Sequence, residues 1–285
     1  MERAQTDRLL VQRNVILGLL LALAAAAWVL LAWQGMDMAM TSPTMGLRAP
    51  LFLAIWVVMM VAMMFPTAAP MILTFHKVQA SRRQRGEAFV ATWVFVAAYL
   101  LVWTLSGVAA YAGALAAEAV AARVALSPAA AARIGGAVLV AAGLYQVTPF
   151  KDLCLSKCRT PIGFIMTSWR DGVAGALRMG VLHGAYCLGC CWLLFVILFP
   201  LGIMNVVAMA VITLVIFAEK TLPWRRRVAR VTAAALVGYG AVVLAAPQAL
   251  PTFMATDGTA ATAVAAPMDM QNMPMPASAT APARQ

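Results

Sequence analysis

The chain has 285 residues, of which 64% are hydrophobic, and its 11% of charged residues is about half the share found in a soluble globular domain. This composition excludes an ordinary soluble protein and indicates a polytopic membrane protein. The net charge of +11 does not indicate nucleic-acid binding, because the basic residues cluster at the ends of apolar segments, as orientation signals do.

Seven apolar segments follow one another along the chain, each long enough, or nearly so, to cross about 30 Å of hydrocarbon as a helix. They lie near residues 14–33, 51–75, 88–112, 129–149, 173–200, 203–219 and 228–247, and the sequence defines the lengths of the fourth and sixth least well. Ser127 and Pro128 suit the start of the fourth, as cap and first-turn residue. The predicted fold is all-α, a polytopic bundle of about seven transmembrane helices.

The distribution of Lys and Arg predicts the orientation of these helices. With the N-terminus in the cytoplasm, seventeen of the 21 basic residues fall on the inner side and four on the outer side. Because cytoplasmic loops carry the excess of Lys and Arg, we expect seven spans with the N-terminus inside and the C-terminus outside. The spans form a membrane domain over residues 1–249, and residues 250–285 form a Met-rich tail that we expect to be disordered on the outer side.

Methionines follow the first predicted helix and recur in the tail. The segment GMDMAM carries Met36, Met38 and Met40, and the tail contains PMDMQNMPMP. Solvent-exposed methionine has no packing role, and thioethers prefer the soft ion Cu(I) over Zn²⁺, Mg²⁺ or Ca²⁺. We therefore expect both segments to capture copper outside the cell membrane, with plain low complexity as the alternative for the tail.

The second predicted helix, WVVMMVAMMFPTAAPM, carries a methionine stripe. The stripe consists of two pairs with i, i+4 spacing, Met59 with Met63 and Met60 with Met64. Pro66 removes one helical hydrogen bond, so that the Ala62 carbonyl loses its usual donor and the helix is expected to kink. These thioethers suit Cu(I) transfer, although packing of an irregular core is an equally good reading of a methionine stripe.

Two cysteines, Cys154 and Cys158, lie in the predicted inner loop KDLCLSKCRTP. Their spacing of four places both thiols on one face if this loop is helical. We expect the neighbouring Lys151, Lys157 and Arg159 to lower the pKa of these thiols and so to favour metal-binding thiolates.

The fifth predicted helix contains the element HGAYCLGCCW, an unusual set of soft ligands in an apolar segment. His183 lies four residues before Cys187, and Cys190 and Cys191 follow one turn later. His183 and Cys190 lie about 10 Å apart along the helix axis, so the stripe suggests two overlapping metal stations. A lone cysteine is often a small apolar filler, but intramembrane ionisable residues are rare and usually functional.

Glycines in the same helix are expected to let other helices approach closely, and two further ionisable residues complete the candidates. Gly180, Gly184 and Gly189 carry no side chain that would hold a neighbouring helix away. His76 and Glu219 lie at inner helix ends, where we interpret both as ordinary interfacial groups.

The patterns WxxMMxAMMxP, LYQxTPxKxxCLxxC and HGxYCxGCCW together resemble a bacterial family described as predicted metal-binding integral membrane proteins. The resemblance covers roughly residues 50 to 220, and it implies metal binding without specifying the metal or a reaction. The Met-rich ends lie outside it.

Taken together, the sequence predicts a multi-pass protein of the bacterial inner membrane that binds Cu(I), or another soft transition metal, and transfers or transports it. The partners expected are the lipid bilayer and a metallochaperone or membrane oxidase, and no nucleic acid. Two alternatives stay open: a membrane thiol oxidoreductase acting on a quinone or a partner dithiol, and an accessory subunit that loads metal into a membrane oxidase. The sequence favours a non-enzymatic role.

Overall fold

The computed structural model describes residues 2–37 and 43–251, and within these ranges the chain forms helices and no strands. The predicted all-α class is therefore confirmed for the described residues. The longer helices are α1 (Glu2–Asp37), α2 (Ala49–Gln84), α3 (Thr92–Arg123), α4 (Pro128–Tyr145), α7 (Gly172–Val196), α9 (Val206–Thr221) and α10 (Arg225–Ala245). The shorter ones are α5 (Pro149–Arg159), α6 (Pro161–Ser168), α8 (Leu198–Leu201) and the 3-10 turn η1 (Pro247–Ala249).

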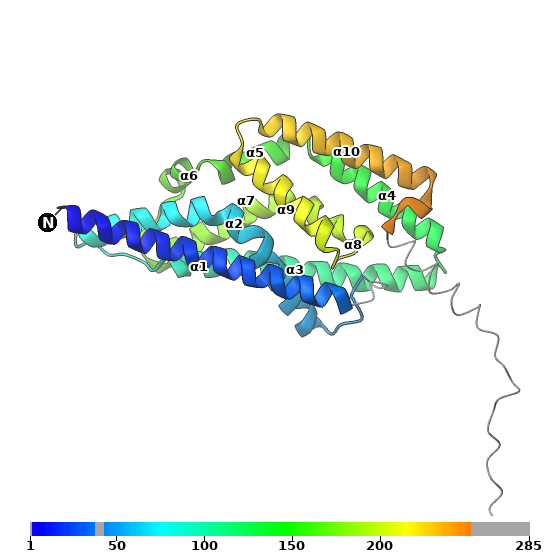
Figure 1. The fold of residues 1–285 in the computed structure, drawn as a ribbon, viewed down its shortest axis with the longest axis horizontal. Coiled ribbons are helices and arrows are strands. Elements are labelled where there is room, and N and C mark those ends of the chain that lie inside the picture. Colours follow the sequence, from blue (N-terminus) through cyan, green and yellow to red (C-terminus); the bar gives the residue numbers. More distant parts are fainter. Residues whose placement is uncertain (1, 38–42, 252–285) are drawn as a thin grey trace, which may run out of the picture.

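The long helices form an elongated bundle in which successive helices run back and forth (Figure 1). α2 packs between α1 and α3, α3 packs on α7, and α4 pairs with α10. The start of α1 and the end of α10 lie at opposite ends of the bundle (Figure 1).

Six helices in the described residues are long and apolar enough to cross a membrane: α1, α2, α3, α4, α7 continued by α8, and α10. The prediction of seven such segments was wrong for residues 203–219, because α9 has only 16 residues and is about 24 Å long at 1.5 Å per residue. α9 still runs antiparallel to α10 and closes the bundle between α2 and α10 (Figure 1). Length alone separates it from the other six.

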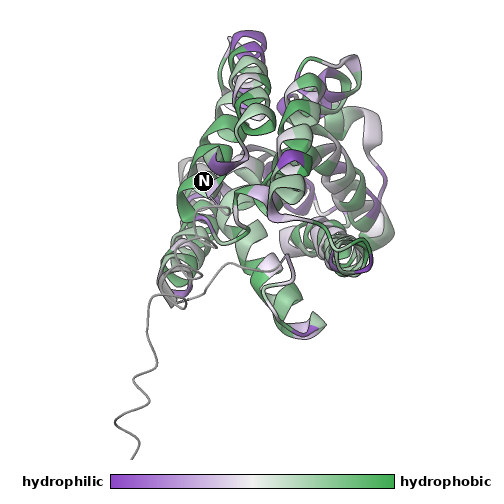
Figure 2. Ribbon diagram, turned by 90° about the vertical axis from the view of Figure 1, so that its right-hand side faces the viewer, coloured by the Kyte–Doolittle hydropathy of each residue, from purple (hydrophilic) through white to green (hydrophobic). Residues whose placement is uncertain are grey.

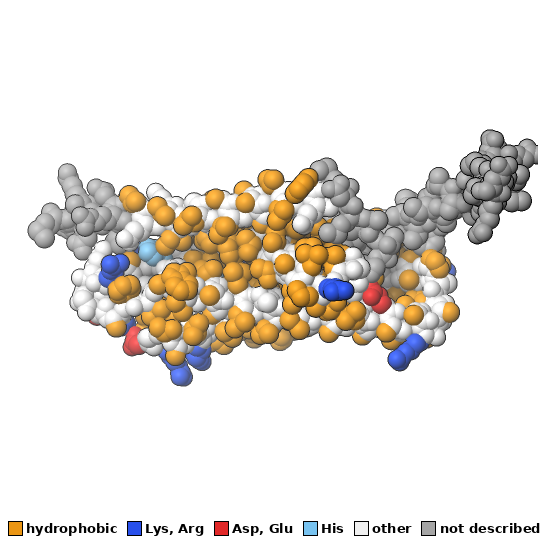
Figure 3. All heavy atoms as spheres, turned by 90° about the horizontal axis from the view of Figure 1, so that it is seen from below, with side chains coloured by type: hydrophobic (Ala, Val, Ile, Leu, Met, Phe, Trp, Pro, Cys, Tyr) orange, Lys and Arg blue, Asp and Glu red, His pale blue; other side chains and the backbone are white. Residues whose placement is uncertain are grey.

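The surface of the bundle is strongly apolar. Most of the helical ribbon carries hydrophobic residues (Figure 2). Hydrophobic side chains cover most of the face shown in Figure 3, and Lys and Arg side chains are few on it. Such a surface is suited to lipid contact, since a soluble monomer rarely exposes apolar patches of this extent.

Two local features expected from the sequence are present. Ser127 precedes α4, its side chain accepts a hydrogen bond from the Ala130 backbone N–H at 3.2 Å, and Pro128 occupies the first turn. In α2, the carbonyl of Ala62 that Pro66 leaves without its helical donor accepts a hydrogen bond from the Trp28 indole at 3.1 Å. The α2 ribbon changes direction along its length (Figure 1).

The short helices α5 and α6 fill the connection between α4 and α7. Thr148 caps α5 by accepting from the Lys151 backbone N–H at 3.3 Å, and Pro149 starts its first turn. Pro161 starts α6 immediately afterwards, so the chain turns twice within a few residues. Because α5 packs against α7, this connection brings Cys154 and Cys158 beside the fifth predicted helix.

Candidate metal centre

α7 positions its polar side chains by close packing against α3 and α5. A Cβ atom at Gly180 would lie 2.5 Å from the Phe95 carbonyl oxygen of α3, and one at Gly189 would lie 2.9 Å from the Cys154 sulfur of α5. A Cβ at Gly184 would meet Val102 at 2.9 Å. The expected close approach at these glycines is confirmed, and each glycine brings a neighbouring helix against the cysteine-bearing face.

Cys187 is the centre of the polar cluster inside the bundle. Its sulfur lies 3.1 Å from the Lys220 Nζ and 3.3 Å from the Tyr99 hydroxyl. The thiols of Cys190 and Cys191 donate hydrogen bonds to its backbone carbonyl at 3.1 and 2.8 Å. All five residues are buried, so three different helices surround one sulfur atom away from solvent.

The two cysteines of α5 are buried on the face that contacts α7, as the helical reading of the CxxxC pattern predicted. Hydrogen bonds with Cys187 and Cys190, together with burial, raise the pKa of the Cys158 thiol well above its usual value. Burial, and after it the charge of Cys190, raises the pKa of Cys154. The prediction that nearby cations lower the pKa of these thiols was therefore wrong.

Lys151 does not lower the pKa of these thiols, because its side chain points toward Glu219 instead. Its Nζ lies 2.8 and 2.7 Å from the two carboxylate oxygens of Glu219, and both side chains are 2% exposed. Glu219 is therefore a buried partner of Lys151, and our interpretation of it as an interfacial group was wrong. His76 is half-buried, and its Nδ1 lies 3.1 Å from the Thr92 hydroxyl.

His183 lies one turn before Cys187 in an aromatic enclosure. Its ring stacks on Phe95 and Tyr99, with centroid distances of 5.9 and 5.5 Å, and meets the ring of Phe164 edge-on at 5.7 Å. Both ring nitrogens are buried, and neither has a hydrogen-bond partner in the described part of the chain. A buried imidazole without partners is costly, which makes this ring a candidate ligand.

Lys220 connects the cysteine cluster to the methionine-bearing helix α2. Its Nζ donates to the Thr67 hydroxyl at 3.1 Å, and this hydroxyl in turn donates to the Met64 carbonyl at 3.0 Å. The Met64 sulfur lies 3.9 Å from the same hydroxyl. The chain of contacts therefore leads from Met64 through Thr67 and Lys220 to Cys187.

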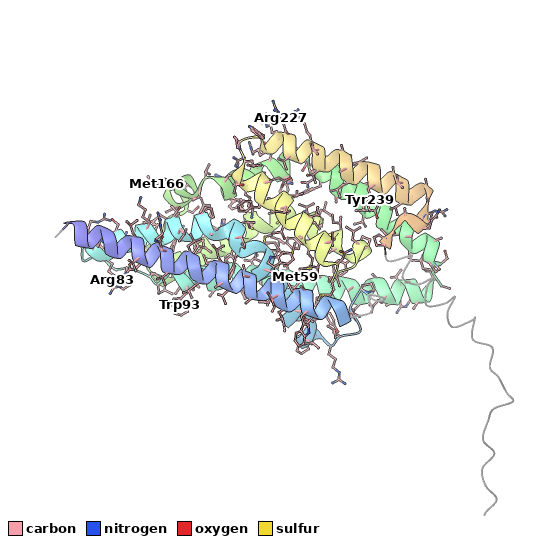
Figure 4. All side chains as sticks on the ribbon, viewed as in Figure 1. Met59, Arg83, Trp93, Met166, Arg227 and Tyr239 are labelled. Atoms are coloured by element: carbon pink, nitrogen blue, oxygen red, sulfur yellow. The ribbon has the colours of Figure 1, made fainter. Side chains whose placement is uncertain are left out.

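The methionine stripe of α2 is fully inside the bundle. Each of its four side chains is at most 1% exposed, namely those of Met59, Met60, Met63 and Met64. Figure 4 shows Met59 among side chains of the bundle rather than at its edge. Burial agrees with both readings of the stripe, packing and thioether ligation. Met38 and Met40 and the side chain of Met36 lie outside the described residues, as do residues 252–285.

The cluster is a set of free thiols rather than a preformed cage. All five cysteines are free and buried. Within residues 2–37 and 43–251, no group of three or more His, Cys, Asp or Glu side chains is arranged to hold a metal ion. A two-coordinate Cu(I) site needs only a pair of thiols.

Sequence reasoning found the cysteines and His183 but missed Lys220, Tyr99 and Thr67. Lys220 follows a long apolar run, where a basic residue usually marks the helix end and extends to the membrane surface. Only the adjacent Glu219 distinguishes it from such a residue. Its burial depends on how α9 packs, which no local pattern records.

Comparison with known proteins identifies the family. The model of a family described as "PpoB2: Copper chaperone" matches residues 53–243, which contain α5, α7, α9 and all five cysteines. No curated protein and no solved structure matched the chain. The resemblance to a metal-binding family is supported in this coarser form, with copper as the metal. Because the match covers about two thirds of its length, this chain belongs to the PpoB2 copper chaperone family.

Proposed function

We propose that the chain is a multi-pass protein of the bacterial inner membrane that holds Cu(I) at the buried thiols around Cys187 and passes it on. The observation that carries this proposal is the meeting of four thiols from two helices, Cys158 of α5 and Cys187, Cys190 and Cys191 of α7, beside one buried ammonium group. Thiolates are the ligands that soft Cu(I) prefers.

Lys220 is proposed to balance the charge of the Cu(I)–thiolate site. A Cu(I) ion held by two thiolates carries one net negative charge, and an isolated charge in a buried site is strongly disfavoured. The Lys220 ammonium group at 3.1 Å from the Cys187 sulfur would neutralise that charge. The same residue cannot itself bind a soft cation while it is protonated, so we assign it as a charge partner and not as a ligand.

His183 and the α2 methionines are proposed as the remaining ligands. The imidazole nitrogens of His183 lack partners one turn before Cys187, which suits a second station on α7. Met64 reaches the cluster through Thr67 and Lys220, and Met59, Met60 and Met63 precede it along α2. They extend about 12 Å from Thr67 toward the α1–α2 loop. A stepwise thioether path into the thiol cluster follows from this order.

The outer methionines complete the proposed route. With the N-terminus inside and the C-terminus outside, the α1–α2 loop and the tail would lie on the outer side, where Met36, Met38 and Met40 would collect Cu(I). Cys154, Cys158 and the inner half of α7 would hold the ion nearer the cytoplasm. A metallochaperone or a membrane oxidase would then be the exchange partner.

A membrane thiol oxidoreductase is the second candidate, because the Cys187–Lys220 contact also suits an activated thiolate. Metal analysis of anaerobically purified protein in detergent separates the two. We expect about one copper ion per chain after loading with Cu(I), retained on desalting. A chain that retains no copper but exchanges disulfides with a small dithiol would overturn the copper proposal.

A further inference from the structure

A cleft of about 260 Å³ opens at the end of the bundle where α4 passes into α5 and α10 begins. It is separate from the thiol cluster. Its polar lining residues are Gln146, Thr148, Lys151, Asp152, Arg225, Arg226 and Arg230. Three arginines from the first turns of one helix therefore face the α4–α5 junction.

Gln146 is a buried residue of this cleft whose side-chain amide has no hydrogen-bond partner among the described residues. It is 4% exposed, and neither its amide nitrogen nor its amide oxygen has a hydrogen-bond partner in the described residues. Leaving a buried amide without partners costs about 1–3 kcal/mol per group, so such a group usually serves a ligand or water. Gln146 lines the cleft, which makes a ligand there its natural partner.

The charge of the cleft identifies the class of ligand. Asp152 binds Arg225 at 2.5 Å and approaches Arg226 at 3.8 Å, while Lys151 is committed to Glu219. Arg230 has no hydrogen bond or ion pair within the part of the chain that the structure describes. Three arginines share one carboxylate, that of Asp152, and the lining therefore carries an excess of positive charge.

Two nearby features also bear on the charge of the cleft. Arg159 at the end of α5 is a further arginine near Arg225, since burial, and after it the Arg225 cation, lowers the pKa of Arg159. α10 starts at Arg225 without a side-chain cap, since Trp224 provides none. The free backbone N–H groups and the dipole at the start of a 21-residue helix attract anions.

We propose that this cleft binds a phosphate group. Guanidinium groups match phosphate oxygens in a bidentate geometry, and the Gln146 amide would donate to a further oxygen. In the proposed topology the cleft lies at the inner membrane surface, at the level of lipid headgroups. The phosphate therefore comes from an anionic phospholipid or from free phosphate in the cytoplasm, and basic pockets between membrane helices commonly hold the former.

The test uses the full chain in a zwitterionic detergent and compares three probes. These are short-chain phosphatidylglycerol, short-chain phosphatidylcholine and inorganic phosphate, and binding is followed by native mass spectrometry and thermal shift. We expect phosphatidylglycerol to bind and phosphatidylcholine, whose choline cation the arginines repel, to bind about tenfold more weakly or not at all. Inorganic phosphate that binds as well as phosphatidylglycerol would assign the site to free phosphate.

Three variants make the assignment specific. Arg230→Gln and Gln146→Met should each weaken binding by about tenfold, as expected for loss of one hydrogen bond to a charged group. Arg227→Gln is the matched control, because Arg227 carries the same charge on the same turn but does not line the cleft. Figure 4 shows it at the outer edge of the bundle.

Gln146→Met also separates binding from folding. Because the Gln146 amide has no partner in the described structure, its removal should leave the melting temperature without ligand unchanged or raise it. A stable Gln146→Met protein with reduced binding supports the site. Absence of binding by all three probes, or an equal loss in Arg227→Gln and Arg230→Gln, would overturn it.

Discussion

Replacement of Lys220 by Met tests the charge balance of the proposed copper site. Methionine keeps most of the length of the side chain and removes its charge, whereas the Nζ of Lys220 lies 3.1 Å from the Cys187 sulfur. At an effective dielectric constant of about 20, two unit charges at this distance attract by about 5 kcal/mol. Desolvation and reorganisation offset part of this attraction.

The expected loss of Cu(I) affinity in Lys220→Met follows from this attraction between Lys220 and Cys187. Breaking a buried pair by removing one partner typically costs about 3–5 kcal/mol, which corresponds to a Cu(I) affinity lower by at least about 100-fold. Lys220→Arg keeps the charge and should recover much of the affinity. Lys77→Met removes an exposed lysine from α2 and should leave the affinity unchanged.

The measurement is competition for Cu(I) against a chromogenic chelator, under anaerobic conditions, on protein whose helix content and elution volume match the unaltered chain. An affinity of Lys220→Met within about threefold of the unaltered protein would refute the reasoning, since about 0.6 kcal/mol is too little for a buried charge partner. Equal losses in Lys220→Met and Lys77→Met would point to a long-range field instead of a local contact.

Further expectations concern ligands, stability and topology. Cys187→Ser should lower retained copper more than Met59→Leu or Met63→Leu, because thiolates bind soft ions more strongly than thioethers; the reverse order would exchange the roles of the two stations. Lys151→Met alone should lower the free energy of unfolding by about 3–5 kcal/mol, and adding Glu219→Leu should restore most of it, as measured by thermal unfolding in detergent. A single variant as stable as the double would contradict the buried pair. A reporter that works only in the periplasm, fused to the C-terminus, should be active; activity of a cytoplasm-only reporter there would exclude an odd number of crossings.

Local patterns in the sequence were sufficient for most of the helices. Each of the seven predicted apolar segments contains a helix, and Ser127 and Pro128 start α4 as expected, because caps and helix periodicity depend on neighbouring residues. The estimate of seven segments of spanning length failed at α9. Its apolar run ends at Glu219, and the preceding loop around Gly202 takes several residues from it.

The candidate site was also predictable only in part, where its features depend on neighbouring residues. The i, i+3 and i, i+4 spacing predicted that Cys187, Cys190 and Cys191 can share an ion, which stays a prediction; in the structure the thiols of Cys190 and Cys191 donate to the Cys187 carbonyl. The expected cationic surroundings of Cys154 and Cys158 were wrong, because Lys151 pairs with a residue 68 positions away. Partners at such separations depend on tertiary packing, and a single sequence does not encode them in any short motif.

The central claim is that sulfur atoms around Cys187 hold Cu(I). X-ray absorption at the copper edge of the anaerobically loaded full chain measures this most directly, with Cys187→Ser as the companion sample. The account predicts a Cu(I) edge and a first shell dominated by sulfur in the unaltered protein, and loss of most of the bound copper in Cys187→Ser. A first shell of nitrogen and oxygen, or the same sulfur shell and copper content in Cys187→Ser, would contradict it.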